Sequence, residues 1–275
     1  MRPLRTLLVA IALATTALLA QAKDPFIVLQ STTSTANSGL YDAILPKFTE
    51  RTGIHVRVVA VGTGQALKNA RNGDGDVLLV HATSAEQLFV AAGFGVERFN
   101  VMYNDFIVVG PPTDPAGIAG MTNAAAALAK IAQSRAVFAS RGDNSGTHKR
   151  ERELWIASRI DVRGASGGWY RDTGSGMGAT LNAAVGMGAY TLTDRGTWIS
   201  FKNKGDFKIV VQDAPALSNQ YGVILVNPKR HPNVKAEAGQ KFINWLLGPE
   251  GQSAIGAYRL QGQQLFFPNA PKAFQ

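Results

Sequence analysis

From residue 26 onward, the sequence alternates short apolar runs with longer segments of helical spacing. The runs FIVLQ (Phe26–Gln30), HVRVVAVG (His55–Gly62) and DVLLVHA (Asp76–Ala82) are short and bounded by polar or turn residues, as buried strands are. Between them lie SGLYDAILPKFTERTG and QALKNARNG, in which apolar residues recur on one helix face and a glycine ends the pattern. Strands separated by helices predict a mostly parallel α/β sheet, because parallel strands need crossover connections.

The same alternation continues to the end of the chain. Further strands are expected at DFIVVGPP (Asp105–Pro112), AVFAS (Ala136–Ser140), FKIVVQ (Phe207–Gln212) and YGVILVNP (Tyr221–Pro228). Further helices are expected at TNAAAALAKIAQS, THKRERELWIASRI and ATLNAAVGMG, with two short ones in AGQKFINWLLGPEGQSAIGAY, and YTLTDRGTWISF is expected to turn through residues 194–196. The order predicts two lobes, with residues 23–103 and 216–275 in lobe I and 104–215 in lobe II. A single α/β domain is the alternative that this pattern leaves open.

The first 22 residues have the composition of a cleaved leader. Two arginines, Arg2 and Arg5, precede an apolar run that ends in Ala20-Gln21-Ala22, a small-residue cleavage motif. The apolar run is short for a membrane span of ~20 residues, and no later stretch is long and apolar enough. The sequence also contains no cysteine, which excludes disulfides, thiolate metal sites and a lipid-anchored N-terminus. These features predict an exported, soluble protein held in a Gram-negative periplasm.

The charge balance favours an anionic partner. The formal charge is +9, and loss of the leader leaves 26 basic against 19 acidic residues, or +7. Such a balance suits a nucleic acid, an anionic surface or a small anion. The basic residues are scattered, without a long Lys/Arg run or interleaved aromatics, and export removes nucleic acid as an ordinary partner. A small anion is therefore the expected partner.

Hydroxyl and glycine residues gather at three strand-to-helix junctions. These are Ser31–Thr35 (STTST), Gly62–Gly64 (GTG) and Ser140–Thr147 (SRGDNSGT). Ligands bind at the carboxyl ends of strands in open α/β sheets, and helix starts offer unpaired N–H groups to anions. Any one cluster is explained by ordinary helix capping, which needs one or two hydroxyls. Five hydroxyls in one stretch, and three such junctions, predict an anion site instead.

Arg141 is the residue that points most specifically to an anion. A guanidinium beside a helix N-terminus is electrostatically unfavourable unless an anion lies between them. The alternative is an ion pair with Asp143, which contributes little if exposed. Arg141-Gly142-Asp143 also spells the integrin-binding tripeptide, an adhesion motif that a periplasmic protein would not use.

Other motifs give weaker signals for chemistry. The stretch 174–178 (GSGMG) lacks the spacing of a dinucleotide fingerprint, the four histidines show no metal-ligand spacing, and no G-x-S-x-G elbow occurs. Ser145 and His148 form an i,i+3 pair with no third member of a catalytic triad. The sequence therefore predicts no cofactor, no metal cation and no catalytic residue, and a phosphatase-type enzyme remains the less favoured alternative.

Five motifs together resemble the tungstate-binding proteins of ABC importers. They are STTSTANSGL, VGTGQAL, DVLLVHA, SRGDNSGTHKRE and YTLTDRGTW, which occur in order over nearly the whole mature chain. The resemblance implies the type II periplasmic binding protein fold, with two α/β lobes, two hinge crossings and a ligand cleft between them. It also implies a monomer that binds tungstate or molybdate without turnover and delivers it to an ABC permease driven by a cytoplasmic ATPase.

The resemblance also implies a set of ligand-binding residues. They are Thr32, Thr33, Ser34, Thr63 and Gly64 from lobe I, and Arg141, Ser145, Gly146, Thr147 and Arg195 from lobe II. The related phosphate-binding proteins carry a proton-accepting carboxylate near the end of the third strand, where this chain reads Val80-His81-Ala82. A site of donors alone should prefer a fully deprotonated dianion, unless Asp143 points into the cleft. Phosphate, sulfate and vanadate remain alternative ligands, and the sequence does not separate tungstate from molybdate.

Overall fold

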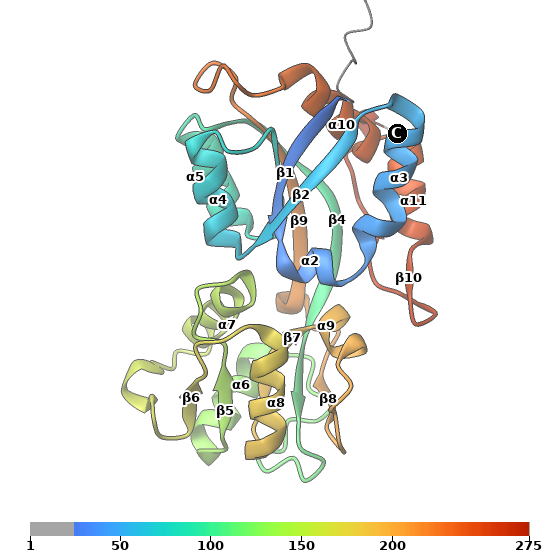
Figure 1. Ribbon diagram of the computed structural model, residues 1–275. Coiled ribbons are helices and arrows are strands. Elements are labelled where there is room, and N and C mark those ends of the chain that lie inside the picture. The colour runs from blue at the N-terminus through green and yellow to red at the C-terminus, as the bar shows by residue number, and fades with distance from the viewer. Residues whose placement is uncertain (1–24, 275) are drawn as a thin grey trace, which may run out of the picture.

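A computed structural model describes residues 25–274, and it has two lobes joined by extended strands (Figure 1). The predicted leader lies outside the described residues. Lobe I consists of β1 (Phe26–Thr32), α2 (Thr33–Asn37), α3 (Leu40–Thr52), β2 (His55–Val61), α4 (Thr63–Asn72), β3 (Val77–Val80), α5 (Thr83–Ala91), the first part of β4 (Gly95–Gly110), β9 (Ser218–Val226), α10 (Ala236–Leu247), α11 (Pro249–Ala257), β10 (Arg259–Leu260), β11 (Gln263–Gln264), β12 (Phe267–Pro268) and the 3-10 turn Lys272–Phe274. Lobe II consists of the rest of β4, α6 (Ala124–Ser134), β5 (Phe138–Ser140), α7 (Gly146–Ala157), β6 (Tyr170–Asp172), α8 (Met177–Met187), β7 (Thr191–Asp194), α9 (Arg195–Ser200), β8 (Lys208–Val211) and the 3-10 turns Arg163–Ala165 and Pro215–Leu217.

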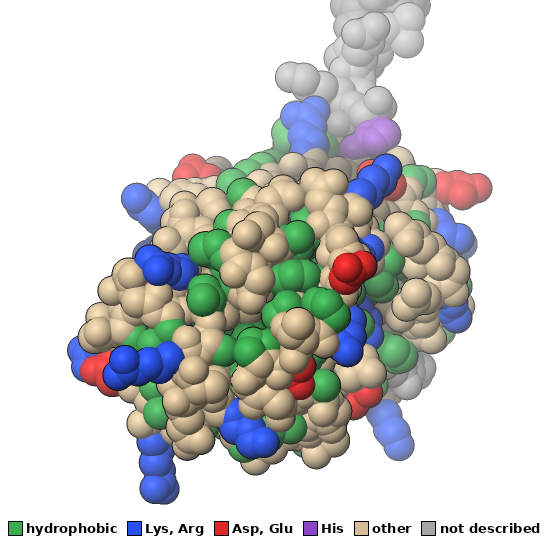
Figure 2. Space-filling view, turned by 90° about the horizontal axis from the view of Figure 1, so that it is seen from below, with side chains coloured by type: hydrophobic (Ala, Val, Ile, Leu, Met, Phe, Trp, Pro, Cys, Tyr) green, Lys and Arg blue, Asp and Glu red, His purple; other side chains and the backbone are tan. Residues whose placement is uncertain are grey.

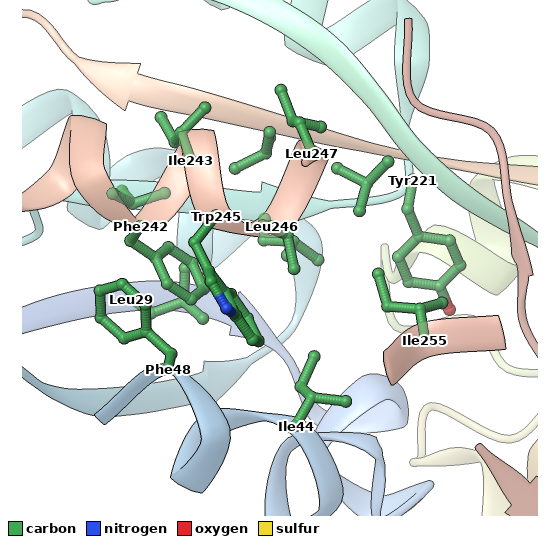
Figure 3. Packing of buried hydrophobic residues seen from close by; sticks show 14 of the residues in the cluster. Leu29, Ile44, Phe48, Tyr221, Phe242, Ile243, Trp245, Leu246, Leu247 and Ile255 are labelled. Carbon is green, nitrogen blue, oxygen red and sulfur yellow. The ribbon is translucent and has the colours of Figure 1, made fainter. Parts of the chain in front are cut away.

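Each lobe has its own hydrophobic core. In lobe I, Leu29 of β1 and Phe48 of α3 pack against Phe242 and Trp245 of α10 (Figure 3). The rings of Phe48 and Phe242 meet edge to face, with centroids 5.1 Å apart. Helix α10 packs on the sheet of lobe I, because its apolar residues fall on one helix face and polar residues such as Lys241 lie on the opposite face.

The lobe II core is built on aromatic side chains from other elements. Trp155 of α7, Phe138 of β5 and Tyr170 of β6 are all buried in it. Phe138 and Trp155 pack edge to face at 5.2 Å. This cluster is separate from the lobe I cluster, so the single-domain alternative is wrong and the fold is the predicted two-lobed α/β architecture.

Two strands carry the chain between the lobes. Met102 of β4 lies in the lobe I core, whereas Phe106 of the same strand lies in the lobe II core. β4 pairs with β9 as far as Asp105 opposite Ser218, and from Phe106 onward it pairs with β7 and β8. The predicted division at residues 103/104 and 215/216 remains a proposal about which residues move together.

The prediction of a mostly parallel sheet is wrong. The order in the main sheet is β12-β4-β9-β3-β1-β2, and only the pairs β1–β2 and β1–β3 are parallel in it. β4 takes the chain out of lobe I and β9 brings it back, so these two strands run in opposite directions and pair antiparallel. Only β5 and β6 form a further parallel pair among the described strands.

The expected turn at residues 194–196 is also wrong, because α9 begins there. Asp194 is its N-cap, and its Oδ1 accepts a hydrogen bond from the Thr197 N–H at 2.8 Å. The Thr197 hydroxyl donates to Asp194 Oδ2 at 2.6 Å. This side-chain cap satisfies helix N–H groups that a turn would have left to solvent.

Candidate functional site

A small cavity lies where the two lobes meet. Its volume is about 30 Å³, and its walls come from Thr32, Thr33, Ser34, Val61, Gly62, Thr63, His81, Arg141, Ser145, Gly146 and Thr147. Eight of the ten predicted ligand residues line it, and Gly64 and Arg195 do not. Because a single water needs roughly 10–15 Å³ of such space, the cavity admits only a very small ligand.

The first wall is the junction between β1 and α2. β1 pairs in parallel with β2 on one side and β3 on the other, so its carboxyl end opens between them. The Thr32 hydroxyl lies 2.7 Å from that of Thr35 and 3.3 Å from that of Ser34. Ser31 turns away from the cavity, because its hydroxyl donates to the Leu79 carbonyl at 2.8 Å. This junction presents hydroxyl groups and no charge.

The second wall is the start of α4, which follows β2. Thr63 is its first residue and is 1% exposed, and Gly62 before it is extended. Within residues 25–274, the buried Thr63 Oγ1 has no hydrogen-bond partner. Gly64 faces lobe II outside the cavity, since a Cβ there would lie 3.7 Å from Asn144 Nδ2 and 3.9 Å from Lys149 Nζ.

The third wall is the loop between β5 and α7, and it carries the charge. The Arg141 side chain is 14% exposed, and its Nη2 contacts Asp143 Oδ2 at 2.5 Å. Its Nε is buried without a hydrogen-bond partner in the described part of the chain. The ion pair with Asp143 that the sequence left open is therefore present, yet it leaves one guanidinium donor unused in the cavity wall.

Asp143 turns away from the cavity and stabilises the loop. Its Oδ1 accepts from the Ser145 N–H at 3.2 Å, and its Oδ2 accepts from Arg141. Burial raises the pKa of Asp143, but the bonds from Ser145 and the charge of Arg141 hold that pKa below its ordinary value. Asp143 therefore stays ionised at neutral pH, and it does not line the cavity.

Helix α7 directs its N-terminus at the cavity. Ser145 is the N-cap and accepts from the His148 N–H at 3.2 Å, which leaves the N–H groups of Gly146 and Thr147 as the first donors of the helix. The first turn contains no acidic residue to occupy them. A Cβ at Gly146 would lie 2.7 Å from His81 Cε1 and 3.1 Å from Thr63 Oγ1, so only glycine allows the lobes to approach here.

His81 lines the cavity and was not among the predicted ligand residues. It follows β3 and is 8% exposed, with Nε2 3.3 Å from Ser34 Oγ and Nδ1 3.0 Å from Asn219 Oδ1. Burial lowers its pKa to about 4, so it is neutral at physiological pH. The sequence signal for His81 is its place directly after the third strand, beside the junctions that follow β1 and β2, because its spacing from the other histidines bears only on metal binding.

Arg195 lies outside the cavity and has its own counterion. Its Nε and Nη2 bind both carboxylate oxygens of Asp105, at 2.8 and 2.5 Å for the two shortest contacts, and Nη2 also donates to Gln212 at 3.1 Å. The hydrogen bonds that Arg195 donates to Asp105 raise the pKa of Arg195. This pair joins α9 to the point where β4 crosses between the lobes. The structure thus gives Arg195 a structural contact at the crossing.

Comparisons with known proteins give a consistent result. The model of the PBP superfamily domain matches residues 19–250. A tungstate-binding protein TupA of Peptoclostridium acidaminophilum is 49% identical over 250 residues, which cover 90% of this chain and 86% of that protein. A putative ABC transporter anion-binding protein of Haloferax volcanii is 48% identical over 249 residues, covering 89% of this chain and 72% of that protein.

Solved structures agree in both fold and sequence. A tungstate-binding protein TupA of Desulfovibrio alaskensis G20 superimposes with a TM-score of 0.80 at 50% identity, covering 90% of this chain and 100% of that one. A structure described as the tungstate ABC transporter of Geobacter sulfurreducens gives a TM-score of 0.76 at 48% identity, covering 85% and 98% of the two chains. The chain therefore belongs to the PBP superfamily and, within it, to the family of the TupA proteins.

Proposed function

We propose that this protein is an extracytoplasmic solute-binding protein that captures a tetrahedral oxyanion, tungstate first among them, and delivers it to an ABC importer. The names of its relatives support this proposal, since two proteins called tungstate-binding are 49% and 50% identical to it over most of their length. The cavity supports it independently, because it is small and combines hydroxyls, a guanidinium and a helix N-terminus.

The observation that carries the proposal is a pair of unused donors. Thr63 Oγ1 and Arg141 Nε belong to residues of opposite lobes that line the same cavity, and neither atom has a hydrogen-bond partner in the described chain. A buried polar group without a partner costs about 1–3 kcal/mol. A ligand that only accepts hydrogen bonds would satisfy both donors at once, and an oxyanion is such a ligand.

The acceptors around the cavity favour a fully deprotonated anion. No carboxylate is among the residues that line it, and both oxygens of Asp143 are engaged by Arg141 and Ser145. A ligand hydroxyl would therefore find no carboxylate acceptor, only the weaker neutral hydroxyl oxygens, which disfavours hydrogen phosphate relative to tungstate, molybdate or sulfate. Vanadate and phosphate remain the weaker alternatives for the same fold.

The geometry gives little support to a phosphatase-type enzyme. The Ser145 hydroxyl accepts from the backbone N–H of His148, while His148 Nδ1 accepts from the backbone N–H of Asn144 at 2.9 Å. The His148 imidazole thus contacts the Asn144 backbone rather than the Ser145 hydroxyl, so it does not activate a nucleophile. No group of three or more potential metal-binding residues occurs within residues 25–274.

Export and delivery form part of the same proposal. The leader at residues 1–22 would place the mature protein in the periplasm as a monomer, where closure of the lobes would present a surface to the permease and its ATPase. No helix within residues 25–274 is long and apolar enough to cross a membrane. On the lobe II end, the Lys and Arg side chains stand apart from one another rather than forming one patch, which suits a small anion better than a polyanion (Figure 2).

Calorimetric titration of the mature protein tests the proposal. Tungstate should bind tightly at a single site, and phosphate should give no heat at the same concentrations. Molybdate and sulfate, run in parallel, rank the dianions against each other. Tight phosphate binding with weak tungstate binding would contradict the ligand assignment, and no heat from any of these anions would contradict the function.

A further inference from the structure

His81 connects the cavity, the hinge strands and the opposite lobe. Its ring packs on Tyr221 of β9, with centroids 4.8 Å apart, and lies 6.4 Å from the ring of Phe106 of β4. Its Cε1 closely faces Gly146 of lobe II. His81 also lines a larger groove of about 660 Å³ outside the cavity. The side chain therefore forms the wall between the ligand cavity and a groove from which a proton can reach it.

Two asparagines on the hinge strands determine which nitrogen of His81 carries a proton. Asn104 of β4 and Asn219 of β9 lie directly opposite each other, both at most 2% exposed. Asn219 Nδ2 donates to Asn104 Oδ1 at 2.6 Å, so Asn219 Oδ1 is the atom that faces His81 Nδ1, at 3.0 Å. A carbonyl oxygen only accepts, hence the hydrogen of neutral His81 is on Nδ1 and Nε2 has a free lone pair.

This tautomer directs the Ser34 hydroxyl away from a bound anion. Ser34 Oγ is 3.3 Å from His81 Nε2, and an unprotonated Nε2 can only accept. The Ser34 hydroxyl therefore donates its single hydrogen bond to His81. The Ser34 oxygen then directs only its lone pairs into the cavity, and these repel an oxyanion. A proton on Nε2 would reverse the bond, because His81 would donate to Ser34 and the Ser34 hydroxyl would be free to donate to the anion.

The charge balance of the cavity also favours a proton on His81 when a dianion is bound. The charge of Arg141 is offset by Asp143 at 2.5 Å, so a dianion would enter a site with no net formal charge. Arg141 and, more weakly, Arg150 of α7 both disfavour an imidazolium at His81 in the protein without ligand. The other charged or titratable groups nearby are Lys149, His148, Arg152 and Glu153 in the shared groove, and Asp194, which lies near both Arg141 and Tyr221. A proton on His81 would offset half of the charge that a dianion brings.

We infer that His81 is the positioning residue of the site, and that each dianion is captured together with one proton, which moves from solvent to His81 Nε2 and turns the Ser34 hydroxyl toward the anion. This inference rests on the proposed function, since it requires a dianion in the cavity. Its chemistry balances, because one N–H bond forms on the imidazole and one proton leaves the surrounding water or buffer.

The direction of the pH dependence follows from the free protein. Burial lowers the pKa of His81 to about 4 in the free protein, and a neighbouring dianion raises it. Affinity should therefore increase as the pH falls from 8 toward 5.5, because the bound state holds more protons than the free state. Where one full proton is taken up, the dissociation constant should change by about tenfold per pH unit.

Calorimetry in buffers with different protonation enthalpies measures the proton directly. At pH 6, the apparent enthalpy of tungstate binding should change with the buffer by an amount that corresponds to about one proton taken up. His81→Gln places a donor amide near Ser34 that does not titrate, so this variant should still bind tungstate but with no proton uptake and a flat pH profile between 5.5 and 8.

Two matched variants identify the proton acceptor. His148→Gln removes the other histidine of the groove, and Glu151→Gln removes a buried carboxyl of α7 whose pKa is raised to about 7 by burial. Both should leave the proton uptake at its wild-type value. Tungstate binding without proton uptake by the wild-type protein, or uptake that survives in His81→Gln, would overturn the inference and leave the proposed function standing. Absence of tungstate binding would instead overturn the proposed function.

Discussion

The two lobes contribute different kinds of groups to the cavity, two of its walls coming from lobe I and the third from lobe II. The lobe I walls, built on β1 and α4, offer hydroxyls that form short contacts with one another, and their only titratable side chain is the neutral His81. The lobe II wall offers a guanidinium and the N-terminus of a twelve-residue helix. Lobe II should therefore supply most of the attraction for an anion, whereas lobe I should decide how the anion is oriented and whether a protonated ligand is accepted.

The largest expected effect comes from removing the charge of lobe II. Arg141→Ala should weaken tungstate binding by roughly 3–4 kcal/mol, several hundredfold, because a desolvated charge-assisted contact is lost and Asp143 is left without its partner. Arg171→Ala, which removes an exposed arginine of the same lobe, is the control and should bind normally. An Arg141→Ala protein whose affinity stays within a factor of two of wild type would show that the site lies elsewhere.

The lobes also differ in how they hold a buried glutamate. Glu86 of lobe I has a cationic partner, since its Oε2 accepts from Arg98 at 2.7 Å. Glu151 of lobe II accepts from neutral groups instead, among them Trp155 Nε1 at 3.1 Å and the Tyr170 hydroxyl at 2.7 Å. Burial raises the pKa of Glu151 to about 7. Its folded-state pKa is thus above its unfolded value.

Glu151 should therefore make lobe II less stable as the pH rises. Its contribution is complete below about pH 4.5 and is lost as the pH rises through about 7, amounting to about 3 kcal/mol. Urea unfolding at pH 5 and pH 8 measures this contribution. The decrease should be smaller in Glu151→Gln than in the wild-type protein, and equal decreases in both would show that Glu151 does not titrate in this range.

Closure of one wall onto the other depends on the space at Gly146. Gly146→Ala should cost about 2 kcal/mol of tungstate affinity, because the new methyl group would meet His81 Cε1 and Thr63 Oγ1 across the lobe boundary. The thermal midpoint without ligand should change little, since the lobes can separate. Gly178→Ala, where a Cβ meets nothing within 4 Å, is the matched control. Normal affinity in Gly146→Ala would mean that the lobes do not close on the ligand at this point.

The smallest expected effect is on a lobe I residue, Thr63, whose substitution should change tungstate affinity without lowering stability. Thr63→Val should weaken tungstate binding by about 1 kcal/mol while leaving the free energy of unfolding unchanged or slightly higher, because its hydroxyl has no hydrogen-bond partner within residues 25–274. Thr49→Val is the contrasting variant, since the Thr49 hydroxyl donates to the Ile54 carbonyl at 3.0 Å. It should lower stability without changing affinity, and loss of stability in Thr63→Val would contradict this account of the free site.

Local sequence patterns predict the three strand-to-helix junctions, but they do not predict which distant residues contact those junctions in the folded chain. The strand–turn–helix order placed Thr32, Thr63 and Arg141 at carboxyl ends of strands, and the structure brings these residues to one cavity. The role of His81 depends on Asn219, 138 residues away, and so on the register of β4 against β9. That register arises from the return of the chain between lobes, which no local pattern records.

Arg195 is a second residue whose contacts depend on a distant part of the chain. Its spacing in TDRGT was compatible with a second cation for the ligand, but Asp105, 90 residues earlier, occupies its guanidinium. The first part of β4 was missed for a local reason, because residues 95–104 (GVERFNVMYN) mix charged, polar and apolar residues without a continuous apolar run. Pairing with β9, and with β12 at Met102 and Tyr103, makes this segment a strand.

The most direct test of the account is the position of the anion itself. Crystals grown with tungstate should give a single strong anomalous peak at the tungsten absorption edge, between the walls of the cavity. Its oxygen atoms should lie within hydrogen-bonding distance of both Thr63 Oγ1 and Arg141 Nε, two donors without hydrogen-bond partners among the described residues. A peak elsewhere, or one that contacts only one of the two lobes, would contradict the claim that the lobes bind the anion jointly.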